Sequence, residues 1–142
     1  MTIANPAALR QADAMVIELA GRQRMLAQRV SKNVCLLSTM PNMDTAAAEL
    51  ALARDTFDST LSALYVGMPA MGIQAPPTDE IETGLAEVAE LWKQIQPFAL
   101  RAADGDTLDP SSLEQMFYGG NGLTGGMNSV VGLYTTATAT GT

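Results

Sequence analysis

Histidine is absent from this chain of 142 residues. Without an imidazole there is no histidine general base, so Ser-His-Asp and Cys-His nucleophilic systems are excluded. The histidine ligands of HExxH zinc sites and of di-iron helical bundles are missing as well. Since no grouping of nucleophile, base and orienting residue is visible, we expect a protein that is not an enzyme and that uses no metal and no cofactor.

Cysteine and aromatic residues are scarce. The single cysteine, Cys35, cannot form an internal disulfide, and its apolar helical surroundings predict a small core side chain rather than a reactive thiol. The chain has only three Phe, three Tyr and one Trp, whereas strands are enriched in aromatic and β-branched residues. Among the apolar residues Ala, Leu and Met dominate instead, so the composition predicts an all-α protein with one continuous core.

Positive charge is also limited. Eight Lys and Arg residues are outnumbered by 15 Asp and Glu residues, which gives a net charge of -7. This argues against nucleic-acid binding, because phosphate contacts need a surplus of cations. Half of these basic residues nevertheless fall within a short stretch, namely Arg22, Arg24, Arg29 and Lys32. This local patch of an acidic protein can attract a small anion.

Long apolar runs are missing. No segment approaches the roughly 18 uninterrupted apolar residues that span a bilayer. The N-terminus also lacks the basic start and apolar core of a signal peptide. The sequence as it stands predicts a soluble, unexported domain, or a domain cut from a longer membrane protein whose flanking segments would supply the membrane contact.

Apolar residues recur in three- and four-residue steps along four stretches, as they do in helices that pack into a bundle. In the first stretch this core seam is Leu9, Ala12, Val16, Leu19, Gln23, Leu26, Val30, Asn33 and Leu37. The predicted helices run from Pro6 to about Ser38, from an Asp44 cap to about Val66, from Thr78 to a turn at 103–106, and from Asp109-Pro110 to about Tyr134.

Short loops force such helices to alternate in direction, so we predict an antiparallel up-and-down four-helix bundle. Pro97 should kink the third helix or end it early. The glycines of Gly119–Gly126 predict a fourth helix that is kinked, bulged or divided near Gly120. The GxGxxG spacing at 120–125 has no flanking βαβ unit, so a helix irregularity is the better reading than a dinucleotide loop. The whole chain forms one domain, with a core at about 6–135 and a flexible tail at 136–142.

The first helix carries a second stripe, displaced from its core seam by about 100° around the axis. It consists of Ile17, Ala20, Arg24, Ala27 and Ser31. The small residues on either side of the arginine allow another helix to come close while leaving a pocket around the guanidinium. The stripe therefore predicts a buried or interfacial position for Arg24, against the alternative of a solvated surface residue.

Arg22 is different, because Glu18 stands one turn before it and predicts a simple surface ion pair. If a two-fold axis passes near the stripe, Arg24 meets its own copy, and the two like charges repel unless an anion lies between them. A planar oxyanion such as nitrate or nitrite fits the guanidinium fork. Gln23, Gln28 and Asn33 are neutral donors that could complete such a site or satisfy buried polar groups.

The segment from Leu19 to Lys32, LAGRQRMLAQRVSK, resembles the signature helix of PilJ/NarX-like sensor domains. Weaker similarity continues at Phe57–Leu61, Leu91-Trp92, Pro97-Phe98, Met127-Asn128 and Val131–Tyr134. The family comprises N-terminal ligand-binding regions of type IV pili methyl-accepting chemotaxis transducers and of nitrate/nitrite sensor kinases. The resemblance implies a four-helix bundle in the periplasm, as the sensor part of an inner-membrane receptor.

In nitrate-sensing relatives the arginine before the methionine of this signature binds the anion at a dimer interface, and Arg24 matches it. Gly21 and Arg29 also match the motif. The predicted ligand site therefore consists of Arg24, Gly21, Arg29 and Gln28. The glycine-rich segment at 119–126 departs from the family's last helix.

The resulting hypothesis is a non-catalytic sensing domain of a chemoreceptor or sensor kinase. It would act as a homodimer that binds nitrate or nitrite and signals by displacement of the first helix. The alternative is a protein-interaction module of a type IV pilus or chemotaxis system with no small-molecule ligand, in which the same stripe receives a partner helix.

Overall fold

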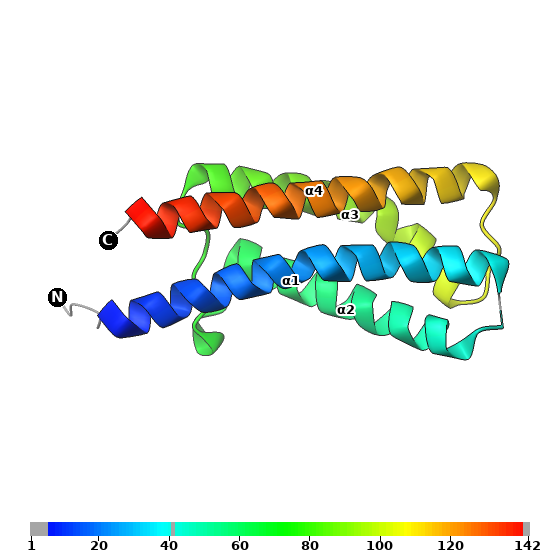
Figure 1. Cartoon of the computed structure of the whole chain (residues 1–142), viewed down its shortest axis with the longest axis horizontal. Helices are drawn as coiled ribbons and strands as arrows, with labels where there is room; N and C mark the ends of the chain where they lie inside the picture. The colour runs from blue at the N-terminus through cyan, green and yellow to red at the C-terminus, as the bar shows by residue number, and fades with distance from the viewer. Residues whose placement is uncertain (1–5, 41, 141–142) are drawn as a thin grey trace.

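The computed structural model describes residues 6–40 and 42–140, with side chains described for 14–40 and 42–137. Four long helices form an antiparallel up-and-down bundle, so that α1 begins and α4 ends at the same end of the molecule (Figure 1). The helices are α1 (Pro6–Thr39), α2 (Asp44–Val66), α3 (Asp79–Ala103) and α4 (Pro110–Thr140). The predicted fold class is confirmed.

Each helix packs against its two neighbours around a square. α1 contacts α2 and α4, and α3 contacts the same two helices from the opposite corner, with a smaller diagonal contact between α1 and α3. The loop before α3 carries the short 3-10 helix η1 (Pro69–Met71) and an isolated bridge between Met68 and Ile73. Within the described ranges, no helix combines the length and hydropathy needed to cross a membrane.

The core is built from the predicted seams. In α1 the buried seam residues are Val16, Gln23, Leu26, Val30, Asn33 and Leu37, while Leu19 is half-buried. Leu9 and Ala12 lie outside the described side chains. At the bundle centre the rings of Phe57 and Trp92 pack with centroids 4.6 Å apart, and the Trp92 indole N–H donates to the Asp58 carboxylate at 3.0 Å.

Thr78 and Asp109, where the sequence predicts that helices begin, both act as caps. Thr78 Oγ1 accepts a hydrogen bond from the backbone N–H of Ile81 at 3.2 Å, and the Asp109 carboxylate accepts one from the backbone N–H of Ser112 at 3.2 Å. Hydrogen bonding by Ser112 also lowers the pKa of Asp109. The cap at Asp44 was wrong, because Met43 occupies the cap position without a side-chain hydrogen bond and Asp44 is already helical. There its charge favours the helix dipole instead.

α4 is not divided near Gly120, because the helix runs without interruption through all its glycines, and the alternative of a kink stays a prediction. A Cβ on four of them would collide with a side chain of a neighbouring helix: Gly119 with Ile95, Gly120 with Ser31, Gly122 with Leu91 and Gly126 with Val88. These glycines let α4 approach both α1 and α3 closely. The packing gained at close range offsets their poor helix propensity, which costs about 1 kcal/mol each relative to Ala.

α3 continues past Pro97 to Ala103, so of the two effects predicted for this proline the early end is excluded and the kink stays a prediction. Two further expectations differ from the structure. Cys35 is exposed rather than part of the core, because it lies on the open side of α1. α4 extends through residues 136–140, which we had assigned to a flexible tail, and residues 141 and 142 lie outside the described part of the chain.

The packing role of the α4 glycines predicts opposite effects for two alanine substitutions. Gly119→Ala should lower the free energy of unfolding by about 1–3 kcal/mol, because the new methyl group collides with Ile95. Gly132→Ala is the matched control, since a Cβ there meets nothing within 4 Å, and it should raise stability by up to about 1 kcal/mol. Urea unfolding measures both. A rise in stability for both variants would contradict the packing argument.

Candidate functional site

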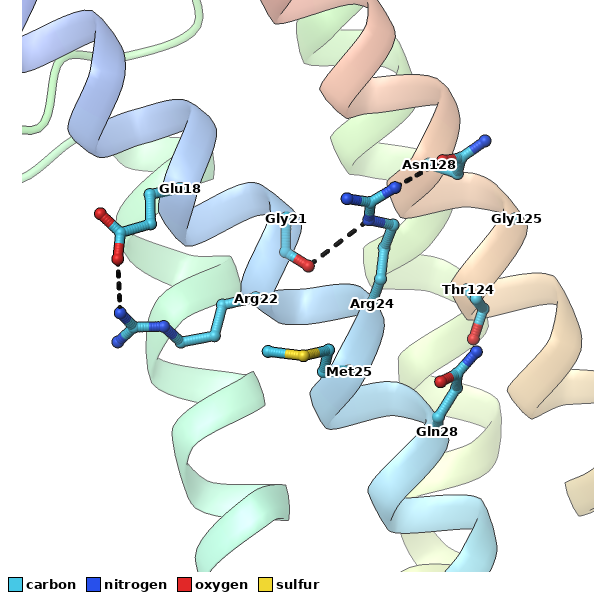
Figure 2. Close-up of a pocket in the computed structure, with 9 residues that line it drawn as sticks. All are labelled: Glu18, Gly21, Arg22, Arg24, Met25, Gln28, Thr124, Gly125 and Asn128. Atoms are coloured by element: carbon cyan, nitrogen blue, oxygen red, sulfur yellow. Dashed lines mark hydrogen bonds and ion pairs between the residues drawn. The ribbon is translucent and has the colours of Figure 1, made fainter.

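A surface groove of about 760 Å³ lies between α1 and α4. Figure 2 shows its lining residues, which are Glu18, Gly21, Arg22, Arg24, Met25, Gln28, Thr124, Gly125 and Asn128. Small residues follow the same stripe of α1: Ala20 and Ala27 are fully buried, and Ser31 lies against Gly120 of α4. They favour a close approach of the two helices on this side of the bundle.

Arg24 stands at the centre of this groove and reaches from α1 toward α4 (Figure 2). Its Nε donates to the backbone oxygen of Gly21 at 3.4 Å, and its Nη1 donates to Oδ1 of Asn128 at 2.8 Å. The side chain is half-buried. The structure thus gives Arg24 an interfacial position, and the helix that approaches its stripe is α4 of the same chain.

The charge of Arg24 is not compensated by any carboxylate among the residues with described side chains. The neighbouring Arg22 pairs with Glu18 at 2.8 Å, as predicted, so the Glu18 carboxylate is already engaged (Figure 2). A guanidinium has more N–H donors than the two that Arg24 uses, and the rest remain free for an acceptor. The groove therefore offers a fixed, unneutralised cation with open donor positions.

The predicted site residues do not all come together. Gly21, Arg24 and Gln28 line the groove, and a Cβ at Gly21 would lie 3.5 Å from Nη2 of Arg24. Arg29 is elsewhere, because it turns toward α2 and lies 3.5 Å from the Glu49 carboxylate, which also binds Lys32 at 3.4 Å. The structure therefore places Arg29 outside this groove.

Gln23 and Asn33 also lie away from the groove. Both are fully buried in the core. Gln23 Nε2 donates to the backbone oxygen of Phe57, and Asn33 Nδ2 donates to the backbone oxygen of Arg29, both at 2.9 Å. Their side-chain nitrogens therefore bond to backbone oxygens of the bundle, whereas Gln23 Oε1 and Asn33 Oδ1 are buried without a hydrogen-bond partner among the described residues.

Sequence reasoning missed the contribution of α4. Asn128, Thr124 and Gly125 complete the far wall of the groove. The sequence gives two weak signals for Asn128: the family similarity at Met127-Asn128, and a place between the core residues Met127 and Val130, on the flank of the buried seam. Assigning it to Arg24 requires the pairing register of α1 and α4, which the sequence does not state.

Residues 8–115 match the model of the family described as PilJ, type IV pili methyl-accepting chemotaxis transducer N-term. The chain belongs to the PilJ family. The matched range includes the Leu19–Lys32 segment of α1, which contains Arg24, and it ends before Asn128. A domain of a chemotaxis transducer is a signalling module, so the chain is a chemoreceptor sensor domain of the PilJ type.

The bundle is similar to the ligand-binding domain of the P. aeruginosa nitrate receptor McpN, with a TM-score of 0.67 and 22% sequence identity. The similarity covers 87% of this chain and 95% of that chain, so the two domains share a fold over nearly their full lengths. No curated protein matches the chain in sequence.

Proposed function

We propose that this domain senses a small planar oxyanion, nitrate or nitrite, through Arg24. The observation that carries the proposal is the uncompensated guanidinium, held at two points and open to the groove. A planar oxyanion can accept paired hydrogen bonds from such a fork. The PilJ family membership and the shared fold with a nitrate receptor's domain support the same reading.

Local charge supports an anion at this place on an otherwise acidic protein. The lining residues include two guanidinium groups and one carboxylate, in a chain whose net charge is -7. Because the carboxylate of Glu18 is occupied by Arg22, an anion meets the field of Arg24 with little opposition. The general repulsion of the acidic surface then disfavours larger anions that extend beyond the groove.

The groove is too open to enclose such an ion alone. Its volume of about 760 Å³ greatly exceeds the roughly 30 Å³ that one water molecule occupies in the liquid. Met25, which is 58% exposed, adds an apolar patch beside Arg24. We therefore propose that a second copy covers this face, so that the anion lies between two Arg24 side chains and offsets their repulsion.

Binding would then change how the paired α1 helices pack, and that displacement would be the signal. In this proposal the domain lies in the periplasm as the sensor part of an inner-membrane receptor, like the transducers that name its family. In this proposal the ligand is a small oxyanion, and the residues around Arg24 determine how it binds.

A second candidate function is protein recognition. Phe117 and Tyr118 of α4 are 56% and 65% exposed, and their rings meet edge to face with centroids 5.8 Å apart. Exposed adjacent aromatic residues are typical of protein contact sites. A partner from a type IV pilus or chemotaxis system would use this pair, and its binding would be insensitive to Arg24 and to nitrate.

The anion proposal predicts different results for two arginines of the same helix. Arg24→Ala should weaken nitrate and nitrite binding by at least about tenfold, because it removes a charged hydrogen-bonding partner. Arg29→Ala is the matched control and should bind like wild type, since Arg29 faces Glu49 of α2. Isothermal titration calorimetry measures both. Equal heats for wild type and Arg24→Ala would reject the site.

The position of Gly21 predicts a variant that gains stability and loses affinity. Gly21→Ala should raise the free energy of unfolding by up to about 1 kcal/mol, because alanine favours the helix. Its methyl group would lie 3.5 Å from Nη2 of Arg24 and take up space beside the free donors. Nitrate affinity should therefore fall. Thermal unfolding with titration separates the two effects, and unchanged affinity would place the anion elsewhere.

The proposed dimer predicts a specific cross-link. In a Cys35→Ser background, Met25→Cys should form an intermolecular disulfide under mild oxidation, because Met25 lies on the open face of α1 beside the groove. Leu52→Cys is the control, since Leu52 is 67% exposed on α2, away from that face. Non-reducing gel electrophoresis measures the rates. Equal rates at both positions, or none at Met25→Cys, would contradict pairing through α1.

A further inference from the structure

We infer that Asn128 of α4 is a positioning residue of the anion site, one that orients the Arg24 guanidinium without neutralising it. This inference rests on the proposed anion function and adds to it a residue outside the range that matches the family. It is based on the hydrogen bond that Arg24 Nη1 donates to Asn128 Oδ1 at 2.8 Å.

The orientation of this contact follows from the chemistry of the two groups. Arginine has donors only, so the amide oxygen of Asn128 must face it. The guanidinium is thereby tied to α1 through Gly21 and to α4 through Asn128, and its remaining nitrogen, Nη2, lies over Gly21. Two anchors on different helices fix the plane of the fork, so less conformational entropy is lost when an anion binds.

The neutrality of the amide is what makes this anchor compatible with a ligand. An aspartate has nearly the same shape as an asparagine, but its carboxylate would pair with Arg24 and act as an internal anion. Glu18, the carboxylate among the residues that line the groove, is instead held by Arg22 at 2.8 Å. Asn128 thus satisfies one donor of Arg24 and leaves its full positive charge available.

The neighbouring positions of α4 keep the approach to this pair open. Gly125, one turn before Asn128, also lines the groove, and a Cβ there would meet nothing within 4 Å. Thr124 turns its hydroxyl to the backbone oxygen of Gly120 at 3.0 Å, so it is engaged within its own helix. Asn128 is therefore the side chain of α4 that holds the arginine.

The test compares three variants by nitrate calorimetry and thermal unfolding. Asn128→Asp should lower nitrate affinity by more than about tenfold while leaving the melting temperature equal or higher, because the new ion pair competes with the ligand and joins two helices. Asn128→Ala should lower affinity by a smaller factor, about threefold to tenfold, since it removes one anchor. Ser129→Asp adds the same charge at the adjacent exposed position and should bind like wild type.

The results separate this inference from the function on which it rests. Wild-type affinity in Asn128→Asp, alongside lost binding in Arg24→Ala, would overturn the role of Asn128 and leave the anion site standing. Equal losses of affinity and stability in Asn128→Asp would show a merely structural role and overturn it too. If the wild-type domain binds no oxyanion, both the inference and the proposed function fall.

Discussion

The close approach of α1 and α4 is the constraint on which the candidate site depends. Ala20 and Ala27, on the stripe of α1 that carries Arg24, are fully buried, and Gly120 of α4 has room only for a hydrogen atom against Ser31. An arginine on the flank of such a contact cannot extend freely into water, because the second helix stands beside it. Arg24 is consequently held at the groove by groups from both helices, Gly21 and Asn128.

The distribution of ion pairs gives this arginine its distinct character. Arg22 and Arg29 each have a carboxylate partner, Glu18 and Glu49 respectively, and such exposed pairs contribute little to stability. The Arg22 pair also matters for the site, because it engages Glu18, the carboxylate among the residues that line the groove. Arg24 thereby stays available in an acidic chain, which is what recognition of a small anion requires.

The bundle could be predicted from the sequence because three- and four-residue spacing reports directly on which helix face is buried. The site could be predicted only on its α1 side. Arg29 lies outside the groove, which the sequence could not reveal, because the motif fixes the order of residues along the helix but not the partner of each one, here Glu49 of α2. Asn128 was missed and the α4 glycines were misread for one shared reason: both depend on how α4 is aligned against its neighbours. Helix propensity describes a glycine without its neighbours, whereas Gly119 is needed because the side chain of Ile95 on α3 packs against it.

The central claim is that an anion offsets the repulsion between two Arg24 side chains at a shared face. Sedimentation velocity over a range of protein concentrations, with nitrate or with chloride at equal ionic strength, tests it most directly. The account predicts that nitrate shifts the monomer–dimer equilibrium toward the dimer in wild type and leaves it unchanged in Arg24→Ala. An equilibrium in the wild-type domain that is the same in nitrate and in chloride would contradict it.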